Sequence, residues 1–125
     1  VGDTRCCMFH ELDTLTMSGS WQSINGGTGG ITFDSDTVAC GQVMIVGSTS
    51  GAALTIGFVI DFLAENDGGT YSVIQTNVTS LDTSDTSFNA QVAIDSNTVV
   101  AQVTDDSVTS SMKWSAFWKL VQHTF

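Results

Sequence analysis

Apolar and polar residues alternate along most of this chain, which is the pattern of half-buried β-strands. The clearest run covers residues 54–64, where the apolar side chains occupy every second position: Leu54, Ile56, Phe58, Ile60 and Phe62. Residues 87–95 and 97–104 alternate in the same way, and residues 70–77 do so less strictly. The pattern predicts antiparallel strands that each turn one face toward a core.

Short turn segments separate these runs. The chain has no proline, so its turns must be built from Gly, Asn, Asp and Ser. Residues 65–69 (ENDGG) and 95–97 (DSN) each join two alternating runs and predict two hairpins. Turn signals recur about every 10 to 20 residues, as in antiparallel sandwiches and barrels. The predicted fold is therefore all-β, an antiparallel β-sandwich or jelly-roll-like domain of about seven to eight strands.

Two segments depart from simple alternation. Residues 38–46 are apolar on both faces, which predicts a strand that is covered on both sides or lies at an interface. The apolar residues of the first 19 positions have mixed spacing, which fits an extended arm and a short helical turn equally well. We therefore divide the chain into a less regular N-terminal segment, residues 1–19, and a β-sandwich domain, residues 20–125.

The segment KWSAFWKL, residues 113–120, fits two structures. On a helix, its two tryptophans would share one apolar face. As a strand, it would bury Trp114, Trp118 and Leu120. The alternation elsewhere and the absence of a helix stop signal favour the strand. Its opposite face then carries four residues that we predict to contact another subunit or an overlying loop: Lys113, Phe117, Lys119 and Val121.

Charge excludes several classes of partner. The chain has 13 acidic and three basic residues and a net charge of −10. Such a protein repels polyphosphate and anionic lipid surfaces, so we expect neither nucleic acid nor a membrane as a partner. Charged residues make up 13% of the chain, against about 25% in ordinary globular proteins. Low charge with many Thr, Ser and Val residues again favours an all-β domain.

No sequence motif indicates an enzyme. The glycine-rich NGGTGG, residues 25–30, lacks the Gly-Lys-Ser/Thr that a phosphate-binding loop requires, and no Gly-x-Ser-x-Gly elbow is present. Asp61 is the one acid in a strongly apolar strand, and alternation places it on the outer face, away from any buried acid–base pair. We expect no catalytic residues and no enzymatic activity.

Metal ligands are equally sparse. His10 with Cys6 and Cys7, joined by His123, is a poor zinc set because zinc sites separate their cysteines by at least two residues. Two acidic pairs could bind calcium through carboxylate oxygens, but side chains of this kind more commonly cap turns. The two pairs are Asp34 with Asp36 and Asp105 with Asp106. We expect no cofactor, with calcium as the single alternative.

Three cysteines do not make a disulfide framework. Cys6 and Cys7 are adjacent, and Cys40 lies in an apolar run. A bridge from one of the first two to Cys40 remains open, as do reduced thiols retained from assembly in the cytoplasm.

Exposed aromatic rings supply a candidate sugar site. Trp21 and Tyr71, with Phe117 and Phe125, could form a stacking platform flanked by Asn and Gln side chains. The alternative is that these aromatic rings pack in the core or at an interface.

The second half of the chain resembles known proteins. A long apolar strand precedes residues 65–121, ENDGGTYSVIQTNVTSLDTSDTSFNAQVAIDSNTVVAQVTDDSVTSSMKWSAFWKLV. The order of a glycine-rich hairpin, an alternating strand, NTVVAQVT and a final strand with a tryptophan such as Trp114 resembles small β-domains of phage structural proteins. These include tail-fibre and head-fibre tips and capsid decoration proteins. The resemblance covers residues 20–122, and the N-terminal CCMFHELDTL departs from it.

The resemblance implies a virion protein that is assembled in the host cytoplasm. It implies a homotrimer that contacts other virion proteins, and it transfers no catalytic residues. We therefore expect a non-enzymatic capsid decoration (cement) or fibre-tip domain. The alternative is a carbohydrate-binding module or lectin-like receptor-binding domain that binds a host-surface glycan.

Overall fold

The computed structural model describes residues 4–24, 30–49, 54–81, 88–105 and 111–125. Among these residues it has eight β-strands in two antiparallel sheets, which confirms the predicted all-β sandwich. The five-stranded sheet has the order β1 (Thr4–Thr16), β8 (Ser111–Thr124), β3 (Thr37–Ser48), β4 (Thr55–Asp67) and β5 (Thr70–Ser80). The three-stranded sheet has the order β2 (Gln22–Ser23), β7 (Thr98–Asp105) and β6 (Phe88–Asp95). The described residues include no helix long and apolar enough to cross a membrane.

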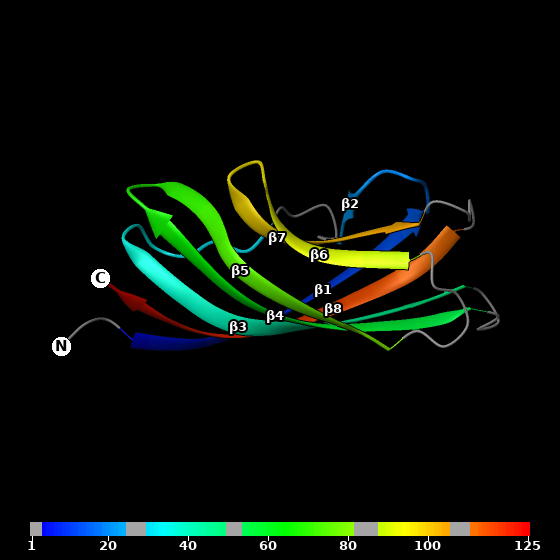
Figure 1. The fold of residues 1–125 in the computed structure, drawn as a ribbon, viewed down its shortest axis with the longest axis horizontal. Coiled ribbons are helices and arrows are strands. Elements are labelled where there is room, and N and C mark those ends of the chain that lie inside the picture. Colours follow the sequence, from blue (N-terminus) through cyan, green and yellow to red (C-terminus); the bar gives the residue numbers. More distant parts are fainter. Residues whose placement is uncertain (1–3, 25–29, 50–53, 82–87, 106–110) are drawn as a thin grey trace.

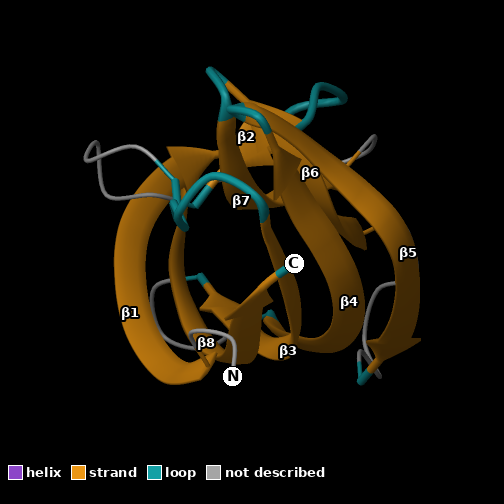
Figure 2. Ribbon diagram, turned by 90° about the vertical axis from the view of Figure 1, so that its left-hand side faces the viewer, coloured by secondary structure: helices purple, strands orange, loops and turns teal. Residues whose placement is uncertain are grey.

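The two sheets form two layers. The five-stranded sheet is long and strongly curved, and the three-stranded sheet lies over its concave side (Figure 1). Seen from the end, the larger sheet curves as a U from β1 to β5, with β2, β7 and β6 above the opening (Figure 2). The convex side of the larger sheet, which we call the outer face, therefore has no described layer over it.

Both predicted hairpins are present, and their turn residues explain them. The β4–β5 turn uses Gly68 and Gly69 at φ of 60° and 96°, where glycine has no Cβ to clash. The β6–β7 turn uses Ser96 and Asn97 at φ of 51° and 58°. Positive φ at both central residues is the geometry of a two-residue type I′ turn, whose twist matches that of the flanking strands.

The core is centred on β8, between β1 and β3. Trp114, Trp118 and Leu120 are buried, so the strand prediction for residues 113–120 is confirmed. Trp118 packs edge-on against Phe62 of β4, with ring centroids 5.4 Å apart. Trp114 packs against Phe88 of β6 at 6.2 Å. The two tryptophans therefore contact both the larger sheet and the layer above it.

The N-terminal segment differs from the expected arm or helical turn. Thr4–Thr16 form strand β1, which pairs antiparallel with β8 along its whole length, from Thr4 opposite His123 to Thr16 opposite Ser111. The mixed spacing has a physical reason. β1 is an edge strand that the second sheet covers incompletely, so it carries apolar residues on both faces. Such a strand lacks the clean alternation of a half-buried strand.

Gly47 of β3 is required by the packing of Trp114. A Cβ at Gly47 would lie 2.4 Å from two ring atoms of Trp114, whereas a Cβ at Gly57 of β4 would lie no closer than 3.5 Å to its nearest neighbour. We expect Gly47→Ala to reduce the free energy of unfolding by about 1–3 kcal/mol, because the ring must move within a filled core. Gly57→Ala serves as the matched control and should be neutral or slightly stabilising. Urea unfolding checks both, and equal losses would contradict this packing.

Candidate interaction surfaces

The outer face of the five-stranded sheet carries an unusual number of exposed apolar side chains. They come from three neighbouring strands: Met8 and Leu12 of β1, Phe117 and Val121 of β8, and Met44 and Val46 of β3. We call these six residues the outer patch. Antiparallel strands place paired residues on the same face of a sheet. The strand register therefore decides whether these side chains are neighbours.

The register makes the outer patch continuous. Phe117 lies opposite His10 on one side and Met44 on the other. Two residues earlier on β8, Ser115 pairs with Leu12 of β1 on one side and with Val46 of β3 on the other. Beside Phe117 the surface holds a shallow depression of about 270 Å³. Its lining consists of His10, Met44, Ile45, Val46, Ser115 and Phe117.

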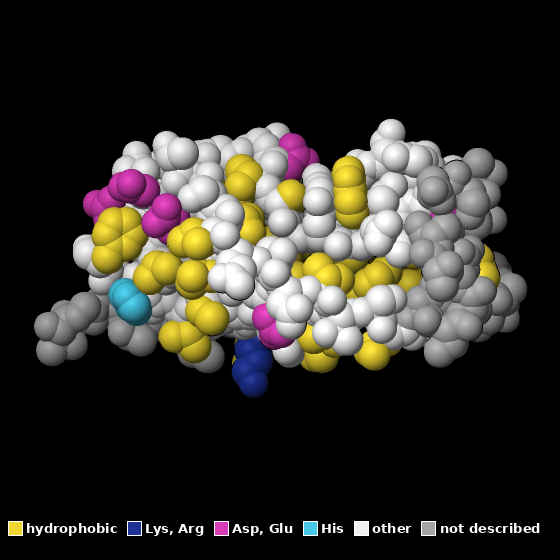
Figure 3. All heavy atoms as spheres, in the orientation of Figure 1, with side chains coloured by type: hydrophobic (Ala, Val, Ile, Leu, Met, Phe, Trp, Pro, Cys, Tyr) yellow, Lys and Arg dark blue, Asp and Glu magenta, His cyan; other side chains and the backbone are white. Residues whose placement is uncertain are grey.

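All four predicted interface residues lie on the outer face. Phe117 is 37% exposed and Val121 is 51% exposed, and Lys113 and Lys119 alternate with them along β8. The predicted orientation of this strand is therefore correct, while the contact with a subunit stays a prediction. Hydrophobic side chains and a basic side chain project together along the lower edge of Figure 3, where the outer face is seen from the side.

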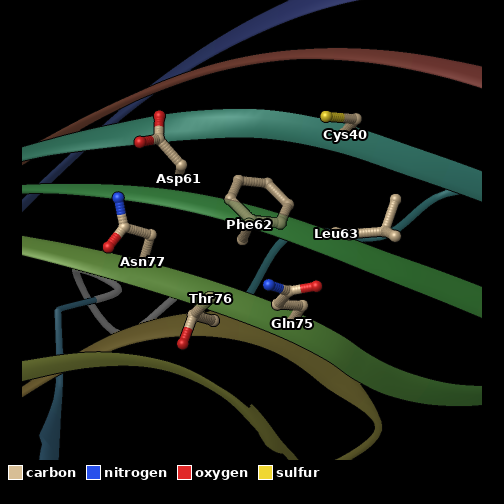
Figure 4. A pocket seen from close by; sticks show the side chains of 7 residues that line it. All are labelled: Cys40, Asp61, Phe62, Leu63, Gln75, Thr76 and Asn77. Carbon is tan, nitrogen blue, oxygen red and sulfur yellow. The ribbon is translucent and has the colours of Figure 1, made fainter.

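A second shallow depression, of about 190 Å³, lies across β3, β4 and β5 (Figure 4). Its lining consists of Cys40, Asp61, Phe62, Leu63, Gln75, Thr76 and Asn77. Asp61 is exposed there and accepts a hydrogen bond of 3.0 Å from Nε2 of Gln42. As predicted, this carboxylate lies on the outer face, and it lacks the burial that would prepare it as a catalytic acid.

The two proposed stacking rings are not brought together. The hydroxyl of Tyr71 donates to the carbonyl of Phe33 at 2.8 Å and accepts from the backbone N–H of Phe33 at 2.9 Å. Tyr71 therefore holds the loop that contains Phe33 in place. Tyr71 lies two residues after Gly69, whose carbonyl accepts a hydrogen bond from Asn97, the residue before β7. Trp21 precedes Gln22, which pairs with Val103 about 20 Å along the same strand. Trp21 is 43% exposed, and glycan binding through it alone stays a prediction.

The candidate metal ligands are also dispersed. The part of the chain that the structure describes has no group of three or more His, Cys, Asp or Glu side chains that could hold an ion. His10 and His123 are opposite Phe117 and Thr4 in the β1–β8 ladder, about 20 Å apart. Among the calcium candidates, Asp36 accepts the N–H of Gly68 at 3.1 Å, and Asp105 is buried. Asp106 lies outside the described residues.

The backbone separates the cysteines. Cys40 has a free, exposed thiol on the outer face. Val121 of β8 lies between Cys40 of β3 and Cys6 of β1, because it pairs with both. Two strand spacings of about 4.8 Å exceed the roughly 7 Å across which Cα atoms can be bridged. A Cys6–Cys40 disulfide would therefore require the sheet to open, and the side chains of Cys6 and Cys7 lie outside the description.

One titratable group has a perturbed environment that no sequence pattern indicated. Oε1 of Glu11 on β1 accepts a 2.9 Å hydrogen bond from Nε1–H of Trp118 at the edge of the core. Burial raises the pKa of Glu11 above its ordinary value of 4.5. The hydrogen bond from Trp118 acts in the opposite direction, and the negative charge of Asp13 adds to the increase. The net effect is a carboxyl group whose charged form is disfavoured in the folded protein.

This perturbation predicts a pH dependence. Because the folded-state pKa of Glu11 is raised, the folded protein binds more protons than the unfolded chain between the ordinary value of 4.5 and the folded value. The contribution of this extra proton to the free energy of unfolding is present below that pH window and is lost as the pH rises through it. Glu11→Gln keeps an oxygen acceptor for Trp118 but cannot ionise. The variant should therefore gain stability relative to the wild type as the pH rises above 4.5 in urea unfolding, and a constant difference would contradict this.

Two solved structures of phage tailspike proteins are similar to this chain at low sequence identity. No protein-family model matches the chain, and no curated protein matches it. Among solved structures, the tailspike protein of Acinetobacter baumannii phage AM24 is similar with a TM-score of 0.44 and 9% identity, over 90% of this chain and 26% of that chain. The tailspike protein of Acinetobacter phage vB_ApiP_P1 is similar with a TM-score of 0.44 and 16% identity, over 97% and 22%. The chain thus spans about a quarter of each, and neither likeness assigns it to a family.

Proposed function

We propose that this domain is a non-enzymatic structural part of a virus particle that acts by assembling with copies of itself through the outer patch. The observation that carries the proposal is the continuity of exposed apolar side chains across β1, β8 and β3. Large exposed apolar patches on soluble proteins commonly mark protein interfaces. The sequence resemblance to phage structural domains supports the virion setting and a homotrimer, as a capsid decoration protein or a fibre tip.

The distribution of charge also favours association at this face. A chain with a net charge of −10 repels its own copies. Lys113 and Lys119 place positive charge beside the outer patch, so the repulsion between copies is weakest where the apolar side chains meet. The exposed edge of such a patch would carry the polar rim that is typical of protein interfaces.

Size-exclusion chromatography with light scattering tests the proposal. We expect assemblies built from units of three chains, each of 13.2 kDa. A mass that stays at one chain at high protein concentration would overturn the proposal. Counting copies in purified particles by mass spectrometry separates the two roles, because a decoration protein covers the shell in far more copies than a fibre tip supplies.

A further inference from the structure

Strand β5 forms one edge of the five-stranded sheet, and beyond a β-bulge at Ile74 it lacks the charges and proline that commonly protect edge strands. No described strand pairs with it on the side away from β4. Its sequence, TYSVIQTNVTS, contains no charged residue and no proline. Natural edge strands commonly carry lysine, proline or inward-pointing charges, because an open edge is a template for pairing with another chain. The other edge of this sheet, β1, does carry charges, at Glu11 and Asp13.

The C-terminal half of β5 is exposed on both of its faces. Residues 74–80 are all exposed, whereas residues 71–73 are partly buried. The neighbouring sheet lies against the start of the strand, where the side-chain amide of Asn97 donates to the carbonyl of Gly69, directly before β5. In Figure 2, β5 runs down the right-hand side of the sheet, at the end of the U. Val78 is 42% exposed, and Leu81, directly after the strand, is 60% exposed.

The ladder with β4 shows which backbone groups face outward. The N–H of Leu81 bonds the carbonyl of Gly57 at 2.7 Å. Bonded and non-bonded pairs alternate in an antiparallel ladder, so Asn77 and Thr79 direct their backbone groups toward β4. Thr76 and Val78 therefore direct their N–H and C=O groups toward the open edge. The one register shift in this ladder is a β-bulge in β5, where Ile74 has no partner because Leu63 pairs with Gln75 and Ala64 with Val73, so the regular edge begins at Gln75.

We infer that β5 pairs antiparallel with β5 of a second copy, across a two-fold axis at Val78. This register places Val78 opposite its counterpart, Asn77 opposite Thr79 and Thr76 opposite Ser80. Every opposed pair is uncharged, and Thr–Ser pairs are favourable across antiparallel strands. The same arrangement would place Leu81 opposite Gln75, which covers the most exposed apolar side chain of this region. The occupant is thus a second copy of this chain, and the two larger sheets become one continuous sheet.

This contact does not compete with the outer patch. The patch lies on β1, β8 and β3, and β5 is two strands beyond β3 in the same sheet. Two strand spacings amount to about 10 Å. One copy can therefore use both surfaces at once. Each of the proposed three-chain units presents three β5 edges, so edge pairing joins these units into assemblies of six chains or more.

Thr76→Pro tests edge pairing selectively. Proline removes the outward N–H of residue 76 and leaves the bonds to β4 intact, as proline does on natural edge strands. Thr76→Val, which keeps the N–H, is the matched control. Sedimentation equilibrium should find six chains or more for the wild type and for Thr76→Val, and three for Thr76→Pro, with circular dichroism confirming that each variant is folded.

A second variant separates this inference from the proposed function. Phe117→Ser alters the outer patch and leaves β5 unchanged. This variant should therefore form a dimer through β5 and no larger assembly. If the wild type has the mass of two chains and Thr76→Pro has the mass of one, the result would support edge pairing and overturn the role of the outer patch. A wild type whose mass is the same as that of folded Thr76→Pro would overturn edge pairing, whatever the outer patch does.

Discussion

Replacing Trp118 by alanine is expected to reduce the free energy of unfolding by about 3–5 kcal/mol. The side chain has no exposed surface and packs edge-on against Phe62. Its indole N–H also satisfies Glu11, which would lose that partner. The cavity lies in the middle of the five-stranded sheet, where β1 and β3 flank β8 and hinder collapse. Urea unfolding of dilute protein, where association contributes little, measures the loss.

Phe117→Ala is the matched control for this variant. Phe117 is the preceding residue on the same strand and points to the outer face, where it is 37% exposed. Its replacement removes only part of the buried surface that Trp118→Ala removes and opens no cavity in the core, so the loss should be smaller by at least about 1 kcal/mol. If both alanine variants lost the same free energy, the assignment of inner and outer faces along β8 would be wrong.

Replacing Phe117 by serine should weaken self-association far more than folding. Phe117 lies at the centre of the outer patch, between β1 and β3, and central aromatic residues contribute most of the binding energy in interfaces. We expect a loss of at least about 2 kcal/mol, or roughly a thirtyfold increase in the dissociation constant of the outer-patch contact. Sedimentation over a range of concentrations measures this change.

Ile94→Ser controls for the loss of an exposed apolar side chain. Ile94 is 36% exposed, almost the same as Phe117, but it lies on β6 of the smaller sheet. Association should be unchanged in this variant. An oligomer that survives Phe117→Ser, or that is equally weakened by Ile94→Ser, would show that the outer patch is not the interface.

Alternation allowed a correct prediction of the strands from residue 54 onward, because β4, β6 and β8 have one face in the core and the turn residues mark the start of β5. It also gave the directions of Trp118 and Phe117 on β8, since a strand fixes the face of every side chain once one is known. The same argument did not identify β1. Its pairing with β8 joins residues more than a hundred positions apart, such as Phe9 and Trp118, and no local pattern reports such a ladder.

The surfaces were less predictable than the strands. Phe117 was recognised as an outward residue, but Leu12 and Met44 join it only through the register of β1 and β3 with β8. Trp21 and Tyr71 were grouped by residue type, and the fold places them at opposite ends of β7. Residue types along a chain thus indicate which side chains can form a site, and the strand order decides which of them meet.

The reactivity of Cys40 tests most directly whether the outer face is covered by association. Its exposed thiol lies on β3 beside Val121 of the outer patch. In a Cys6→Ser/Cys7→Ser background, the rate of labelling by excess maleimide should fall as protein concentration rises and the copies associate. The same protein with Phe117→Ser should label at the rapid rate of the dilute chain throughout. An equally rapid rate for the assembled protein with Phe117 intact would contradict the proposed interface.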